Sequence, residues 1–155
     1  MEITCRPIGF IHTEFTTKET APIQGAFEAG AEGRLELFAE YAQGLQDIEL
    51  FSTLILIYHF DRAGEVLLLR KPFLDDTPHG IFATRHPCRP NGIGISIVQQ
   101  LRREGNTLVV SGIDVLDGTP LLDIKPYVPR FDCFPDASEG WFAGKQKRDK
   151  PAGSE

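Results

Sequence analysis

The chain has 155 residues, of which 41% are hydrophobic and 25% charged, with a formal net charge of −6. This length and composition predict one globular domain and exclude intrinsic disorder as its main state. Its uncharged apolar runs are far shorter than the roughly 20 residues that span a bilayer, and the N-terminus MEITCRPIGF lacks the features of a secretory signal. The sequence therefore predicts a cytoplasmic protein with no membrane contact.

The first half of the chain predicts short strands between loops, as its high content of glycine and proline requires. Residues 3–11 alternate loosely around Pro7 and predict an edge strand. Residues 16–33 predict a polar loop, and residues 33–37 have the period-two alternation of a half-buried strand. Residues 40–49 predict one or two helical turns.

The strongest predicted strand is Leu54–Phe60, which is β-branched and aromatic without a breaker. Residues 71–92 contain too many prolines and glycines for regular structure, so they predict a long shaped loop with one short apolar step at 81–83. Residues 93–101 and 107–115 predict a hairpin in which Gly105-Asn106 supplies positive φ. A helix over residues 95–101 is the alternative, because three apolar residues there also fit a 3.6 period.

The last predicted elements are a turn at residues 117–120 and a short strand at 121–124. Many short strands with long connections predict a mostly β fold, a small single-sheet β-barrel with little helix. We expect residues 1–143 to form this domain and residues 144–155 to form a polar C-terminal tail.

Two patterns in the basic loop suggest binding sites and both are weak. Gly92–Ile97 begins like a dinucleotide fingerprint, but Ile97 occupies the third glycine position and a hairpin follows where a helix is needed. His79, His86 and Cys88 match no standard zinc spacing, so no metal site is predicted. The widely spaced cysteines fit reduced thiols better than disulfides.

The loop at residues 83–92 also concentrates Arg85 and Arg89 among prolines. A guanidinium presents a planar fork of donors that suits a carboxylate or phosphate, and prolines lower the entropy cost of holding such a loop in one shape. Each arginine either binds a ligand or pins the loop to backbone carbonyls.

An acidic cluster follows the predicted hairpin. Asp114 and Asp117 are suited to accept hydrogen bonds from a ligand or to take a proton, whereas Asp117 before a glycine also fits a turn that bonds its own backbone. Asp123 and Lys125 lie on the same face of a short strand, where they pair with each other or with the arginines. Spacing alone does not select one catalytic acid.

Two long strings carry a resemblance to a known family. GIFATRHPCRPNGIGIS (Gly80–Ser96) and GIDVLDGTPLLDIKPYVP (Gly112–Pro129) resemble the signatures of the TsaA-like, or TrmO, family of S-adenosylmethionine-dependent tRNA methyltransferases. The resemblance extends over about residues 3–135. It implies a small β-barrel that works as a homodimer, binds S-adenosylmethionine near the subunit interface, and methylates N6 of threonylcarbamoyladenosine beside the anticodon of tRNA.

The resemblance also implies site residues. Matching segments place the cofactor contacts at Pro22, Ile23, Gln24, Asp61, Arg62, Arg85, Ile95, Asp114, Val115, Leu116 and Asp117. Arg89, Asn91 and Lys125 are predicted to shape the pocket or face the tRNA substrate. The methylated nitrogen is a poor nucleophile until its proton is lost, so Asp114 or Asp117, with Tyr127 as a weaker candidate, is predicted to act as the base.

The chain departs from the family pattern at three places. Asp61 replaces a common histidine and changes the local charge by about one unit. Gly92 replaces a common proline and is expected to loosen the loop. His86 and Cys88 replace a serine and a larger polar or aromatic residue. These departures permit a narrower or shifted substrate.

The charges are segregated along the chain, which bears on the RNA substrate. Residues 61–103 carry seven basic and four acidic side chains, while residues 1–60 carry three basic and nine acidic ones. The predicted surface for the anticodon arm consists of Arg70, Lys71, Arg85, Arg89, Arg102 and Arg103. Two alternatives remain. One is a cofactor-binding module without catalysis, and the other is a methyltransferase for a small molecule or another RNA, which is favoured if this basic patch is discontinuous in the folded dimer.

Overall fold

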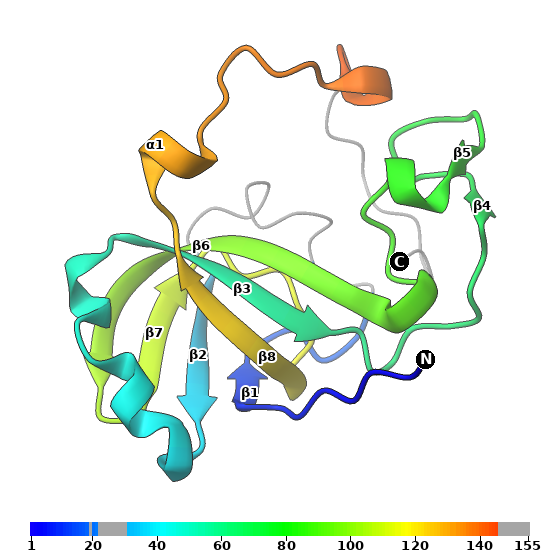
Figure 1. The fold of residues 1–155 in the computed structure, drawn as a ribbon. Coiled ribbons are helices and arrows are strands. Elements are labelled where there is room, and N and C mark those ends of the chain that lie inside the picture. Colours follow the sequence, from blue (N-terminus) through cyan, green and yellow to red (C-terminus); the bar gives the residue numbers. More distant parts are fainter. Residues whose placement is uncertain (19, 22–30, 146–155) are drawn as a thin grey trace.

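The computed structural model describes residues 1–18, 20–21 and 31–145 (Figure 1). Six antiparallel strands close into a ring in the order β1-β2-β7-β6-β3-β8, which confirms the predicted single-sheet barrel. The barrel strands are β1 (Gly9–His12), β2 (Glu32–Leu37), β3 (Thr53–His59), β6 (Ile93–Glu104), β7 (Thr107–Ser111) and β8 (Thr119–Pro126).

The remaining elements are short. Strands β4 (Leu69–Arg70) and β5 (His79–Gly80) form a separate two-stranded ladder, and α1 (Pro129–Asp132) is a single helical turn. The 3-10 helices span Ala39–Leu45, Ile48–Leu50, Ile81–Ala83, Pro90–Gly92 and Gly140–Phe142. The predicted helical turns at 40–49 and the apolar step at 81–83 are therefore present as 3-10 helices.

Alternation along the strands builds the barrel core. In β2, Leu35 and Leu37 point inward and are buried while the residues between them are exposed, as the period-two pattern predicts. Leu54 and Leu56 of β3 are likewise buried, and Ile55 between them is half-buried. Fully buried side chains from the other strands complete this core: Ile11, Val98, Leu108, Val110 and Leu121.

The edge-strand prediction for residues 3–11 is wrong. The strand begins at Gly9, after Pro7, and it pairs with β2 on one side and β8 on the other, so ring closure makes it an internal strand. The hairpin prediction that includes residues 93–101 is confirmed. Its helical alternative over residues 95–101 is excluded, because Gly94, Ser96 and Val98 face inward at alternate positions while Ile93, Ile95 and Ile97 face outward.

Strand β6 is shared between two neighbours, and this sharing opens one end of the barrel. Residues Ile93–Gln99 pair with β3, and residues Gln99–Glu104 pair with β7. Strand β7 ends at Ser111, opposite Gln99, because Gly112 turns the chain with a φ of 86°. The predicted strand over 107–115 is therefore too long, and residues 112–118 form a loop beside the first half of β6.

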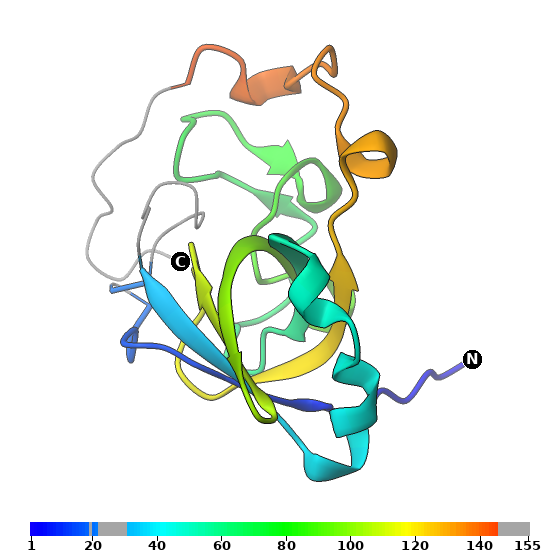
Figure 2. The ribbon, with the colours of Figure 1, turned by 90° about the vertical axis from the view of Figure 1, so that its left-hand side faces the viewer.

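Residues 60–92 and 127–145, called here the outer segments, lie together on one side of the barrel (Figures 1 and 2). Trp141 joins them, since its indole Nε1 donates to the carbonyl oxygen of Ala83 at 2.7 Å. The predicted loop at 16–33 falls largely on residues outside the described ranges, and so does most of the predicted tail. The domain boundary at residue 143 stays a prediction.

Candidate functional site

A cavity of about 680 Å³ lies between the open end of the barrel and the outer segments. Its wall is built from separate parts of the described chain. The barrel contributes the ends of β3 and β6 and Thr119 of β8, and the loop after β7 contributes Asp114, Val115 and Leu116. Lys18 and Ala21 come from the segment after β1, and the outer segments contribute the rest. Of the predicted cofactor and substrate residues, these line it: Asp61, Arg62, Arg85, Arg89, Ile95, Asp114, Val115 and Leu116.

The loop at residues 112–118 is fixed at both ends, which holds its acidic residues in place. Gly112 and Gly118 adopt φ values of 86° and 80°, conformations that favour glycine. Between them, Ile113 is fully buried and Val115 is 4% exposed, so their side chains anchor the loop in the core. Asp114 is thereby carried on a rigid turn at the cavity wall.

Asp114 accepts a short hydrogen bond from Ser96 Oγ, and the hydroxyl of Tyr58 lies 2.9 Å from the same Ser96 oxygen. Burial and the negative charge of Asp114 raise the pKa of Tyr58 well above its ordinary value, while Ser96 and Arg85 oppose this rise. Arg85 and Asp114 both line the cavity and both act on the same phenol, so the structure brings these two predicted residues together.

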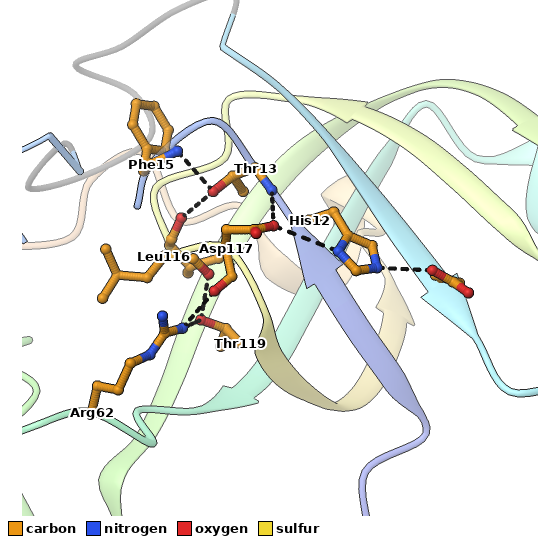
Figure 3. Close-up of polar contacts among 9 residues, drawn as sticks. His12, Thr13, Phe15, Arg62, Leu116, Asp117 and Thr119 are labelled. Atoms are coloured by element: carbon orange, nitrogen blue, oxygen red, sulfur yellow. Dashed lines mark hydrogen bonds and ion pairs between the residues drawn. The ribbon is translucent and has the colours of Figure 1, made fainter. Parts of the chain in front are cut away.

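Asp117 has a different position, shown in Figure 3. Its Oδ1 accepts from the backbone N–H of Thr13 at 3.0 Å and lies 3.5 Å from Nδ1 of His12. Its backbone carbonyl accepts from Nη2 of Arg62 at 2.8 Å. Asp117 is not among the cavity-lining residues, although it was predicted to bind the cofactor or act as the base. Its carboxylate fastens the loop to the end of β1. This contact resembles the alternative turn role, but it uses the backbone of Thr13 and not that of Asp117 itself.

The two predicted arginines of the 83–92 loop differ in their contacts. Arg89 Nη1 donates to the carbonyl oxygens of Thr84 at 2.9 Å and His86 at 3.3 Å, so Arg89 pins the loop as well as lining the cavity. Arg85 lines the cavity and acts on Tyr58. Both predicted uses of a guanidinium therefore occur in one loop.

Gly92 does not loosen this loop. It is buried, its N–H donates to the carbonyl oxygen of Arg89 at 3.0 Å, and its own carbonyl accepts from the N–H of Phe60 at 2.7 Å. Its φ of 57° is one that proline cannot adopt. Asn91 beside it has a φ of 67° and lies outside the cavity lining, so it shapes the turn.

Asp61 lines the cavity where the family commonly has histidine. Its Oδ1 lies 3.3 Å from Nε of Arg62, so a neighbouring guanidinium partly offsets the added negative charge. Arg62 in turn holds the loop after β7 through Asp117 and Thr119. The substitution at residue 61 therefore changes the charge of the wall without leaving an isolated carboxylate.

Five further predicted residues lie away from the cavity lining or outside the described chain. Lys125 Nζ pairs with Asp123 Oδ2 at 2.8 Å on β8. Tyr127 follows β8, and partial desolvation and the neighbouring Cys133 raise the pKa of its phenol, which keeps it protonated at neutral pH. The predicted contacts at Pro22, Ile23 and Gln24 fall on residues that the structure does not describe.

The predicted basic surface is divided. Arg85 and Arg89 lie at the cavity, whereas Arg102 and Arg103 lie at the far end of β6. Arg102 pairs with Glu104 at 2.7 Å and Arg103 pairs with Glu49 at 2.8 Å, so acidic neighbours offset their charge. The six basic residues therefore do not form one continuous surface.

Residues that sequence reasoning missed complete the wall. Pro72, Phe73 and Leu74 precede the signature string, and Trp141 and Phe142 follow the second one. Trp141 stacks on His79 with ring centroids 4.6 Å apart. The single tryptophan of the chain, Trp141, is the one feature of the sequence that could have indicated this part of the wall. The other apolar residues lie outside any strand pattern, so the sequence does not show where they pack.

Within the described ranges, no cluster of three or more histidine, cysteine or acidic residues is arranged to hold a metal ion. The same part of the chain contains no helix with the length and apolar character needed to cross a bilayer. The described cysteines are unbridged: Cys5 and Cys133 are exposed and Cys88 is buried.

Residues 10–133 match the family model of the tRNA-methyltransferase O N-terminal domain. A probable S-adenosyl-L-methionine-binding protein of Pyrococcus abyssi is 52% identical over 139 residues, which cover 90% of this chain and 76% of that protein. The human tRNA (adenine(37)-N6)-methyltransferase is 33% identical over 81% of this chain and 30% of its own length. The crystal structure of TrmO from Pseudomonas aeruginosa matches 91% of this chain with a TM-score of 0.77 and 39% identity, and the chain spans 63% of that structure's length.

Proposed function

The chain belongs to the family of tRNA-methyltransferase O N-terminal domains, and from this premise we propose that it is an S-adenosylmethionine-dependent methyltransferase acting on N6 of threonylcarbamoyladenosine beside the tRNA anticodon. The observation that carries the proposal is the cavity, where eight residues predicted from the resemblance meet from separate parts of the chain. A volume of about 680 Å³ is suitable for a nucleoside cofactor.

The residues of the wall fit this cofactor by their chemistry. Asp61 and Asp114 provide acceptors for ribose hydroxyls or an amino group, and Arg85 provides a fork of donors for a carboxylate. Ile95, Val115 and Leu116 provide apolar surface for a purine. When bound, S-adenosylmethionine supplies an activated methyl group on a sulfonium cation.

The chain's own residues then orient the reactants and accept a proton. Positioning of the methyl donor and the nucleophilic nitrogen supplies most of the rate enhancement, because the cofactor is already activated. Asp114 is the proposed acceptor of the N6 proton, since of the three predicted candidates it alone belongs to the cavity lining. Asp117 and Tyr127 are left with structural roles in this proposal.

We also propose that the protein works as a homodimer through the outward face of β6. Ile93, Ile95, Ile97 and Leu101 expose an apolar stripe there, and apolar surface of this kind favours association. Ile93 and Ile95 also line the cavity, so a second copy on this stripe would border the site. Light scattering coupled to size-exclusion chromatography should give a dimer for the wild type and a monomer for Ile97→Lys, a residue outside the lining.

The deciding experiment uses labelled S-adenosylmethionine and bulk tRNA from strains with and without the threonylcarbamoyl modification. After digestion, the label should be found in the modified nucleoside and only in tRNA from the modifying strain. Label in another nucleoside from both strains would contradict the proposed substrate and favour a different RNA.

A binding module without catalysis is the second candidate, because several similar proteins are named only for cofactor binding. Calorimetry distinguishes it from the enzyme. Saturable binding of S-adenosylmethionine with no transfer to any tRNA would favour the module and overturn the methyltransferase proposal.

A further inference from the structure

Three side chains from separate elements form a hydrogen-bonded chain that ends at the cavity. Tyr58 belongs to β3, Ser96 to β6 and Asp114 to the loop after β7. Tyr58 is 3% exposed and Ser96 is 5% exposed, and Tyr58 and Asp114 both line the cavity. The hydrogen bonds therefore run along the wall of the candidate site, with the buried Ser96 hydroxyl between the two lining residues.

The direction of the protons follows from the chemistry of the groups. An ionised Asp114 carboxylate only accepts, so Ser96 donates its single hydroxyl hydrogen to it. Ser96 Oγ is then left to accept, and Tyr58 donates to it at 2.9 Å. Because burial and the charge of Asp114 raise the pKa of Tyr58, the phenol keeps its proton at neutral pH.

Gly94 provides the space that this chain needs. A Cβ atom at residue 94 would lie 2.3 Å from Cε2 of Tyr58 and 2.7 Å from Cζ of Phe60. The rings of Tyr58 and Phe60 pack edge to face, with centroids 5.4 Å apart, so neither ring has room to withdraw. Gly94 and Ser96 both lie on the inward face of β6. Gly94 leaves room for the ring of Tyr58, and Ser96 contacts its hydroxyl.

Charged groups from every neighbouring part face the same cavity. Arg85 and His86 come from the basic loop, and Asp61 and Arg62 follow β3. Lys18 and Glu139 come from the two ends of the chain. These groups carry both signs of charge, so the hydrogen bond from Ser96 fixes the direction of the Asp114 carboxylate among them.

We propose that Ser96 is a positioning residue that holds the Asp114 carboxylate ionised and oriented toward the reactants, and that Tyr58 holds Ser96 in turn. The proposal rests on the proposed function, in which Asp114 contacts the reactants. Ser96 touches Asp114 directly and Tyr58 acts through Ser96, so the loss of Ser96 has the larger effect.

Turnover of the variants tests whether the loss of Ser96 has a larger effect than the loss of the Tyr58 hydroxyl. Ser96→Ala removes a hydrogen bond to a charged group and should lower kcat about tenfold or more at saturating cofactor. Tyr58→Phe should lower kcat about twofold to fivefold, and adding Tyr58→Phe to Ser96→Ala should lower it no further. In an Asp114→Asn background, Ser96→Ala should have no effect on the remaining turnover.

Ser52→Ala and Tyr41→Phe are the matched controls, because both residues lie outside the cavity lining. Each should keep wild-type turnover. Thermal unfolding of every variant shows whether it folds. Additive effects of Tyr58→Phe and Ser96→Ala, or wild-type turnover of Ser96→Ala, would overturn the proposal.

A titration without cofactor or RNA separates this proposal from the proposed function. Carboxyl carbons labelled with ¹³C report the protonation of Asp114 by NMR. Since a donated hydrogen bond favours the charged form, Ser96→Ala should raise the pKa of Asp114 relative to the wild type, while Ser52→Ala leaves it unchanged. An unchanged titration refutes the positioning role. A raised pKa in a protein that methylates no tRNA supports Ser96 as the residue that holds Asp114 and refutes only the proposed function.

Discussion

The barrel and the outer segments are held by different kinds of contact. The barrel strands are joined by backbone ladders whose register is set by alternating buried side chains. In the described chain, the outer segments have only the short β4–β5 ladder and separate contacts such as Trp141 with Ala83 and Lys145 with Asp75. The cavity lies between the two regions, so one wall is rigid and carries Asp114, while the other is fastened at a few points and carries Arg85.

The largest expected effect compares a buried leucine in each region. Leu56→Ala removes a fully buried barrel side chain and should lower the free energy of unfolding by about 2–5 kcal/mol in urea denaturation. Leu74→Ala removes a leucine that is 6% exposed in the outer segments and should cost less. Equal costs would contradict the difference between the two regions.

Gly94→Ala tests the junction between the barrel and the site. The added methyl meets the packed rings of Tyr58 and Phe60, and overpacking of this kind should cost about 1–3 kcal/mol of unfolding free energy. Gly44→Ala is the control, because a Cβ at Gly44 has no neighbour within 4 Å among the described residues. If Gly94→Ala unfolds at the wild-type urea midpoint, the rings of Tyr58 and Phe60 can move aside for the methyl group, and the tight packing inferred here is contradicted.

Trp141→Ala tests the fastening of the outer segments. It removes the hydrogen bond to Ala83 and the stack on His79, together worth about 1 kcal/mol at a half-buried site. Hydrogen exchange should accelerate at residues 79–83 and remain slow in β3 and β6. Faster exchange in the barrel strands would mean that the two regions open together.

The smallest effect is a pH dependence of the outer segments. Hydrogen bonds from His79, from the backbone of Asp76 and from Lys145 lower the pKa of Asp75 below its ordinary value of 3.8. Its contribution to stability is therefore present above pH 3.8 and is lost as the pH falls toward the lowered value. Proteolysis by pepsin within residues 72–84 should increase as the pH falls below 3.8 in the wild type. Asp75→Asn should flatten this dependence, and an equally steep profile in the variant would refute the role of Asp75.

The barrel was predictable because its signals are local. Period-two alternation in residues 33–37 and the uninterrupted apolar run Leu54–Phe60 predicted β2 and β3 closely. The edge position predicted for β1 was wrong because ring closure joins β1 to β8, a pairing between residues more than a hundred positions apart that no local pattern indicates. The end of β7 was missed because Gly112 reads equally well as part of a strand until its φ is known.

The candidate site was predictable where the signature strings reach it. Arg85 and Asp114 come from the two strings and meet at the cavity. Tyr58 and Ser96 were missed because each belongs to a strand pattern, in which a tyrosine or serine has no distinguishing feature until the inward face is assigned. Asp117 and Tyr127 lie outside the cavity lining, which the sequence could not indicate, because it shows which acids and phenols are near one another but not which way each side chain points.

The closure of the ring also bears on how the protein folds. The β1–β8 pairing joins Gly9 to Leu121, so the barrel stays open until nearly the whole domain has been synthesised. Pairings this distant slow the search for the native state, and all-β domains rich in them typically fold in about milliseconds to seconds. A ribosome-bound chain that stops before β8 should therefore expose β1 and β3 to chaperones, and release of the last strand should trigger cooperative folding.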